Sequence, residues 1–236
     1  MDIHKPKSWH GVREFLKEYA IIVVGVLTAL GAEQAVEILH WRHQVDAGKE
    51  ELKAPIARDL ANTARRAAQE VCVTRRLGEL SRLLETAQAT GRLPASGPIG
   101  QPTSGPWTLQ TWDALVAAQT VAHMPQKEMI AYTRIQRMTA YLSTLADLEI
   151  DDWTILATMQ SAGRRLSDAE AEQLRLALAR ASFADHRTAV NGVRLREGIK
   201  QDGLAQPAAF AEADKLIAAG APQADICRPL SAPRSQ

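Results

Sequence analysis

The sequence predicts an all-α protein, in which an N-terminal transmembrane helix continues into a bundle of four to five helices. Apolar residues recur at steps of three and four along most of the chain, which is the spacing of one helix face. No alternating pattern typical of a β-strand accompanies them. Residues 19–32, which read YAIIVVGVLTALGA, form an apolar run without any charge. These three observations predict the fold class.

The apolar run 19–32 allows three interpretations. As a helix it covers roughly 21 Å, and counting from Phe15 extends it to about 27 Å, close to the ~30 Å hydrocarbon core of a membrane. A cleaved signal peptide also fits, because Ala29 and Gly31 provide the small residues that cleavage requires. A buried core helix of a soluble protein is the third interpretation. The spanning helix comes first, because helical pattern continues beyond the run into residues 33–44.

The basic residues around the run predict its orientation. Those before the run are Lys5, Lys7, Arg13 and Lys17, and those close behind it are Arg42 and Lys49. Because positive charge collects on the cytoplasmic side, residues 1–18 are expected in the cytoplasm. Residues 19–41 then form the transmembrane helix and its exit, and 42–219 a periplasmic helical domain.

Small residues share one face of the apolar helix. Gly25, Ala29 and Ala32 are spaced so that two helices could approach closely there. The alternative is that Gly and Ala are simply common in membrane helices.

The helices of the domain follow from periodicity and from their end signals. The first helix is expected to run to about Ala89, with Pro55 kinking or interrupting it. Residues 91–106 hold four Gly and four Pro, so we expect a loop that is either mobile or a contact surface. The first helix carries an apolar stripe of Leu60, Ala64, Ala67, Val71, Leu77, Leu80 and Leu84.

Local signals place the later helices. Trp107 is expected to open a short helix to about His123, and the next helix covers 126–161. Ser167 and Glu170 form a capping box, which starts another helix. Pro207 starts the last helix, which ends near Ala219. Residues 220–236 are expected to be an irregular tail.

Two cysteines are predicted to form a disulfide. Cys72 lies in a predicted helix and Cys227 lies in the tail. Pairing is expected of an extracytoplasmic domain, whereas two free thiols would be expected in the cytosol. The bridge would fasten the tail to the body.

Asp185 is the candidate buried polar site. It occupies the apolar stripe of the helix that Ser167 begins, where a charge is costly unless it is paired. We expect an ion pair with an Arg from a neighbouring helix, and the alternative is a ligand-binding role. An acidic group on another helix is expected instead to be a solvated face: Asp147, Glu149, Asp151 and Asp152.

The remaining signals favour neither catalysis nor metal binding. The sequence contains no glycine-rich phosphate loop, no nucleophile elbow and no zinc-protease motif. Glu37 and His40 form one acid–histidine pair, but a bundle metal site needs two such pairs and further carboxylates. The net charge of +1 gives no basis for nucleic-acid binding. We therefore expect no metal, no cofactor and no catalytic residue.

The N-terminal segment FLKEYAIIVVGVLTALGAEQAVEILHWRHQV resembles the opening of uncharacterised bacterial membrane proteins. The shared features are a basic-acidic lead, a short hydrophobic helix with a VxGVLxAL-like core, and a polar helix with Trp followed by Arg. The resemblance implies a single-pass protein with a helical extracytoplasmic part, and it implies no activity.

These observations together favour a non-enzymatic, membrane-anchored interaction or accessory subunit of a bacterial inner-membrane complex. Its partner would be another protein or a second copy of the chain. The alternative is a periplasmic ligand-binding sensor, which predicts an internal pocket near Asp185 bordered by Trp or Tyr. A third possibility is an unrecognised enzyme or a cleaved, secreted helical protein.

Overall fold

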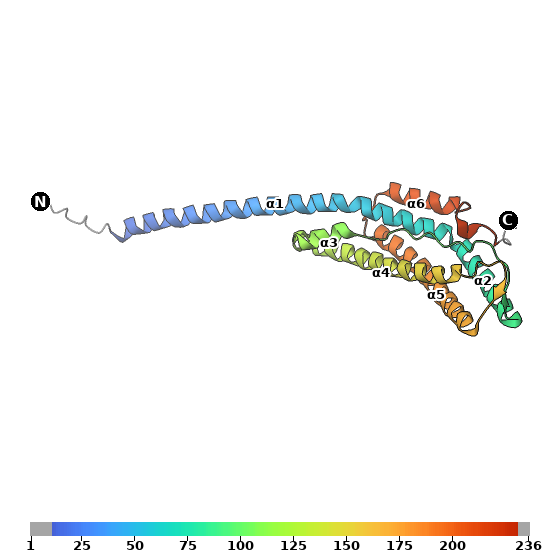
Figure 1. Ribbon diagram of the computed structural model, residues 1–236. Coiled ribbons are helices and arrows are strands. Elements are labelled where there is room, and N and C mark those ends of the chain that lie inside the picture. The colour runs from blue at the N-terminus through green and yellow to red at the C-terminus, as the bar shows by residue number, and fades with distance from the viewer. Residues whose placement is uncertain (1–10, 231–236) are drawn as a thin grey trace. The chain divides into compact units, whose positions relative to one another are not determined.

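The computed structural model describes residues 11–230, so the predictions for Lys5, Lys7 and the last residues of the tail lie outside the described range. The chain forms two compact units, Met1–Ala47 and Gly48–Gln236, which we treat separately. Six α-helices occur between residues 11 and 230, and the only strands there are two of two residues each. The predicted all-α class is therefore confirmed (Figure 1).

Helix α1, Val12–Ala68, supplies the described part of the first unit and continues into the second. It is the one described helix that is long and apolar enough to cross a membrane, with a mean hydropathy of 1.7 over an 18-residue window. None of that window is buried. Its large side chains, among them Ile21, Leu27 and Leu30, are more than half exposed.

The expected interruption of the helix at Pro55 is wrong, because Pro55 lies inside α1, whereas the alternative of a kink at Pro55 stays a prediction. Leu52 and Ile56 on either side of it are almost completely buried, and this packing outweighs the hydrogen bond that proline removes. The helix ends instead at Ala68, and after a turn at Gln69 helix α2 covers Glu70–Thr90.

The turn at Gln69 also divides the apolar stripe that was predicted to be continuous. Ala67 and Val71, the two members nearest the turn, are exposed, and Val73 is buried instead. The side chain of Gln69 helps to hold this turn. Its amide donates to Arg65 O at 3.3 Å, and its Oε1 accepts from Thr103 N at 2.9 Å.

The 91–106 loop is packed against the rest of the second unit along much of its length. Strand β1, Arg92–Leu93, pairs antiparallel with β2, Arg164–Arg165, a feature that the sequence pattern did not predict. Leu93, Ile99 and Trp107 are at most 2% exposed. We call residues 94–109 the strap.

The helix expected to open at Trp107 begins later. Helix α3 covers Gln110–Ala117, and a 3-10 turn, η1, follows at Thr120–His123. Trp107 therefore belongs to the strap. Its large side chain is buried rather than placed at an exposed helix start.

The remaining helices begin where their local signals predict. Helix α4 covers Gln126–Ala157, α5 covers Asp168–Gln201 and α6 covers Pro207–Ala219, and a 3-10 turn, η2, lies at Asp225–Cys227. Ser167 Oγ accepts a hydrogen bond from Glu170 N at 3.3 Å, which confirms the cap of α5.

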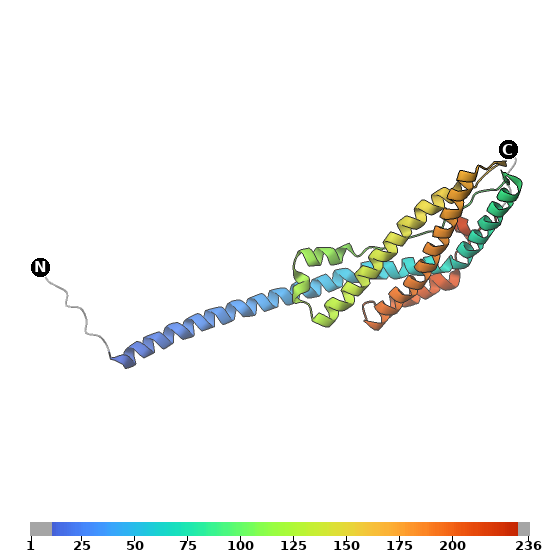
Figure 2. The same cartoon turned by 90° about the horizontal axis from the view of Figure 1, so that it is seen from below.

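Helices α4 and α5 run side by side in both views, and α2 packs against α5 (Figures 1 and 2). One apolar core fills the space among these helices. Its fully buried members include Leu80, Trp153 and Ala177. Ile226 from η2 belongs to the same core, so the end of the described chain is part of the packed body.

Candidate functional site

A buried ion pair joins the end of α1 to the middle of α5, as the position of Asp185 predicted. The Arg66 guanidinium donates through Nη2 to Asp185 Oδ1, and through the same nitrogen to Glu149 Oε1 at 2.8 Å. The side chains of Arg66 and Glu149 are 2% and 1% exposed, and that of Asp185 is 8% exposed. Because buried charges are stable only when paired, this contact fastens α1, α4 and α5 together.

A third carboxylate completes what we call the charge cluster, which consists of Arg66, Glu70, Glu149 and Asp185. Glu70 Oε2 lies 3.4 Å from Arg66 Nη1, and the Glu70 side chain is 36% exposed. Burial, followed by the charge of Asp185, raises the pKa of Glu70. Burial alone would lower the pKa of Arg66, but the carboxylates of Glu149 and Asp185 outweigh it and raise that pKa.

The strap lies against the charge cluster and is held by side chains of α1. Ser104 Oγ donates to Glu149 Oε2 at 2.9 Å, which gives this carboxylate a second partner. Asn62 Nδ2 donates to Pro106 O at 3.0 Å, and Arg58 Nη2 donates to Thr108 O at 2.7 Å. The Gly/Pro-rich segment is thus anchored by hydrogen bonds from side chains, which replace those that a regular element would make.

A cavity of about 200 Å³ lies beside the charge cluster. Its buried lining comes from Thr63 and Arg66 of α1, Trp107 of the strap and Thr188 of α5. The other lining residues, Ala67, Glu70, Ala189, Gly192 and Val193, are exposed or half-buried. The cavity therefore combines two side chains of opposite charge, Arg66 and Glu70, with mainly apolar walls.

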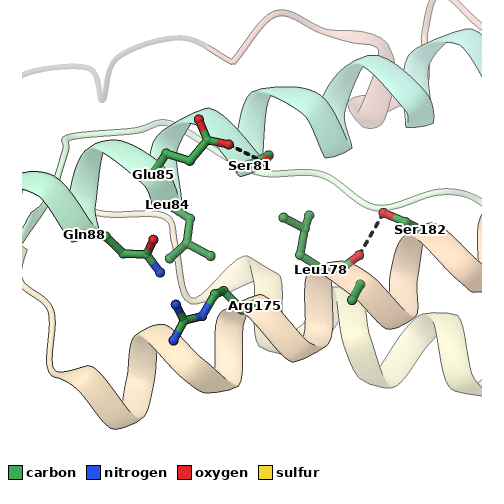
Figure 3. A pocket seen from close by; sticks show the side chains of 8 residues that line it. Ser81, Leu84, Glu85, Gln88, Arg175, Leu178 and Ser182 are labelled. Carbon is green, nitrogen blue, oxygen red and sulfur yellow. Dashed lines mark hydrogen bonds between the residues drawn. The ribbon is translucent and has the colours of Figure 1, made fainter.

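A larger groove of about 400 Å³ lies between α2 and α5 (Figure 3). Leu84 and Leu178 line it together with polar side chains of both helices. The polar groups at this groove bond within their own helices: Ser81 Oγ donates to Glu85 Oε1 at 3.0 Å, and Ser182 Oγ donates to Leu178 O at 2.9 Å. These hydroxyls do not converge on a common point.

Cys72 and Cys227 form a disulfide, with 4.8 Å between their Cα atoms. The bridge joins the start of α2 to η2, as the sequence predicted. Arg75 Nη2 also donates to Cys227 O at 2.6 Å, so that α2 holds this segment by both covalent and polar contacts.

Sequence reasoning missed two of the buried acids. Glu149 and Asp152 were assigned to a solvated face, and this is wrong: they are 1% and 3% exposed, whereas Asp147 and Asp151 are exposed as expected. Asp152 Oδ1 pairs with Arg180 Nη2 of α5 at 2.6 Å. Helical spacing was the available signal, because Glu149 and Asp152 continue the stripe of Leu142, Leu145 and Leu156.

The small residues Gly25, Ala29 and Ala32 lie in the exposed part of α1, in the first unit. A Cβ added at Gly25 would meet no heavy atom within 4 Å. Their predicted role in packing against another helix stays a prediction. Among residues 11–230, no group of three or more His, Cys, Asp or Glu is arranged to hold a metal ion.

A further buried acid, Asp59 of α1, gives a pH-dependent prediction. Its two carboxylate oxygens are buried, and Arg58 Nε lies 3.8 Å from Oδ1. Desolvation raises the pKa of Asp59 from 3.8 to about 7, against the opposing charge of Arg58. The folded state then binds more protons than the unfolded state between these values, so this group's contribution to stability falls as the pH rises from 4 to 8.

We therefore expect Asp59→Asn to raise the free energy of unfolding at pH 8 by on the order of 2–4 kcal/mol. At pH 4 the variant and the natural protein should have similar free energies of unfolding. Urea unfolding at several pH values measures the difference. Asp147→Asn, which removes an exposed carboxylate from α4, should show no such trend. A difference that stays constant across this pH range would contradict the assignment to Asp59.

Comparison with known proteins does not assign this chain to a family. No protein-family model, no curated protein and no solved structure matches it.

Proposed function

We propose that the protein is a non-enzymatic, membrane-anchored interaction or accessory subunit of a bacterial inner membrane. The observation that carries the proposal is the apolar stretch of α1, none of which is buried by described residues. Exposed Ile, Leu and Val side chains in a helix of this length are stable in lipid and costly in water. The same helix continues into a folded domain, as expected of an anchor.

The Cys72–Cys227 disulfide supports a periplasmic location for the domain. Structural disulfides persist in oxidising compartments and are rare in the cytosol. The distribution of Lys and Arg around the apolar run favours the same orientation.

Exposed apolar side chains support a protein partner. Leu176 and Phe183 of α5 are 53% and 62% exposed, and their seven-residue spacing places them on one face of the helix. A contiguous patch of exposed apolar side chains is typical of a contact surface, and the proposal is that Leu176 and Phe183 belong to one. In the membrane, Gly25, Ala29 and Ala32 offer a face for close packing against a second helix.

Labelling of the cysteines tests the location. In intact cells and spheroplasts, a thiol reagent of high mass should label the uncleaved, membrane-bound chain only after reduction. Thiols that react without reduction, and only once the membrane is broken, would place the domain in the cytoplasm. A shortened, soluble product would identify residues 19–32 as a signal peptide.

Co-purification in mild detergent tests the interaction. We expect the natural protein to elute with a partner or as an oligomer. The double variant Leu176→Lys/Phe183→Lys should elute without that partner, as a monomer. Ala211→Lys adds positive charge at an exposed position of α6 and should retain the complex. A strictly monomeric, unassociated natural protein would contradict the proposal.

A further inference from the structure

Polar atoms without partners gather at the 200 Å³ cavity beside the charge cluster. Four buried side chains line it, and three of them carry a polar atom without a hydrogen-bond partner within residues 11–230. These atoms are Arg66 Nε, Trp107 Nε1 and Thr188 Oγ1, and each of the three residues is 2% exposed. Buried polar atoms are ordinarily paired, so three of them around one cavity indicate a place where a ligand binds.

These three atoms require a ligand that accepts hydrogen bonds. The guanidinium Nε–H and the indole Nε1–H can only donate, and a threonine hydroxyl can donate or accept. A threonine in a helix usually donates to a carbonyl of the preceding turn, as Thr63 does to Asp59 O at 2.8 Å, but Thr188 does not. An acceptor oxygen on a ligand would give these donors a partner, and the hydrogen bond from the arginine would be charge-assisted.

The charge cluster disfavours an anion as the source of that oxygen. It holds three carboxylates and one cation, Arg66, whose shortest contacts are to Glu149 and Asp185. Glu70 has the longest contact, at 3.4 Å, and its side chain, which is 36% exposed, also lines the cavity. The surplus negative charge would repel a ligand carboxylate, whereas a ligand N–H could donate to Glu70. The site therefore favours an uncharged molecule that both accepts and donates hydrogen bonds.

The remaining walls suit a small apolar group. Ala189, Gly192 and Val193 of α5 contribute aliphatic surface, and the side chain of Trp107 contributes aromatic surface from the strap. Mainly apolar walls with a few polar groups are the usual composition of a small-molecule site. The volume of about 200 Å³ lies below the usual range for drug-sized ligands, so the molecule must be small.

We propose that this cavity binds a small uncharged amide with a short aliphatic chain. The carbonyl oxygen, which has two lone pairs, would accept from Arg66 Nε and Trp107 Nε1. The amide N–H groups would donate to the Glu70 carboxylate and the Thr188 hydroxyl, and the aliphatic chain would lie against Val193. The site does not depend on the proposed anchoring or on the proposed protein partner.

The test uses the full ¹⁵N-labelled chain in detergent, titrated with butyramide. The indole N–H resonance of Trp107, assigned through Trp107→Phe, should move downfield and saturate as it gains a hydrogen bond. Trp153 is the matched control, because its Nε1 is also buried without a partner within residues 11–230 but lies in the core among α2, α4 and α5. Its resonance should not move. Absence of a saturable shift at Trp107 would mean that the cavity holds only water and would overturn the proposal.

Variants identify the groups responsible, with the Trp107 resonance as the readout. Thr188→Val keeps the shape of the wall but removes the hydroxyl, and should weaken butyramide binding about three- to tenfold. Ala189→Leu fills the cavity and should abolish binding. Ala179→Leu adds the same volume at an exposed position of α5 that does not line this cavity, and should leave the affinity unchanged. Circular dichroism would first establish that each variant is folded. Unchanged binding in Ala189→Leu would overturn the proposal.

Three further ligands of similar shape separate the hydrogen-bonding groups from charge. Butyrate is an anion without a donor, n-butylammonium is a cation without an acceptor, and 2-pentanone has the carbonyl but no N–H. Each should bind about tenfold or more weakly than butyramide, because each lacks a partner for one part of the site or carries an unfavourable charge. An affinity equal to that of butyramide for any of the three would show that the amide is not recognised and would overturn the proposal.

Discussion

Replacing Arg66 with Met should lower the free energy of unfolding by about 3–5 kcal/mol, the largest effect expected of a single substitution in this protein. The change leaves Glu149 and Asp185 buried without their cation. Ser104 continues to donate to Glu149, but a neutral hydroxyl offsets only part of the desolvation of a carboxylate. The destabilisation arises from the two abandoned charges more than from loss of the arginine itself.

Urea unfolding with the disulfide intact, followed by circular dichroism, measures this effect. Arg65→Met is the matched control, because Arg65 precedes Arg66 in the same helix but is exposed. It should cost less than about 1 kcal/mol. Adding Glu149→Gln and Asp185→Asn to Arg66→Met should recover much of the loss, since no unpaired buried charge then remains. A cost for Arg66→Met as small as that of Arg65→Met would contradict the role of the charge cluster.

Removing the disulfide through Cys72→Ser/Cys227→Ser should lower the free energy of unfolding by about 4–5 kcal/mol. The bridge joins residues separated by 155 positions, and in the entropic model a long closed loop restricts the unfolded chain by about that amount. The structure of the folded state should change little without the bridge, because Ile226 stays in the core and Arg76 still donates through Nη2 to Arg228 O. The effect should therefore be seen mainly in the unfolding equilibrium, with little change in helical content.

Reductant provides the control for this prediction. The natural protein in dithiothreitol should unfold at the urea concentration of the double variant, and the double variant should not respond to dithiothreitol. A reductant effect of equal size on the double variant would show that the loss does not come from the disulfide. Full stability of the double variant would contradict the closed-loop account.

Much of the helical fold could be predicted from the sequence because its signals are local. The Ser167–Glu170 capping box starts α5, and Pro207 starts α6, each within a few residues of the signal. Pro55 misled the prediction because its local cost is smaller than the burial of Leu52 and Ile56 on either side. Periodicity alone could not locate the turn at Gln69, which depends partly on a hydrogen bond from distant Thr103.

The candidate site shows the same division between local and distant information. A charge in the apolar stripe of α5 was sufficient to predict that Asp185 is buried and paired with an arginine. The sequence could not say which arginine, since Arg66 lies 119 positions away. The ligand-binding alternative predicted a pocket near Asp185 bordered by Trp or Tyr. The sequence could not say that Trp107 would line it, because the strap has no periodic pattern.

The sequence by itself determined the helical class, the apolar N-terminal helix, most helix starts and the pairing of the only two cysteines. Each depends on periodicity, on the nearest few residues or on the number of cysteines. Only the tertiary structure decided the path of the strap, the partners of Asp185 and the cavity lined by Glu70 and Thr188. These arise where segments far apart in the chain meet, because burial there makes each charge depend on its neighbours in space.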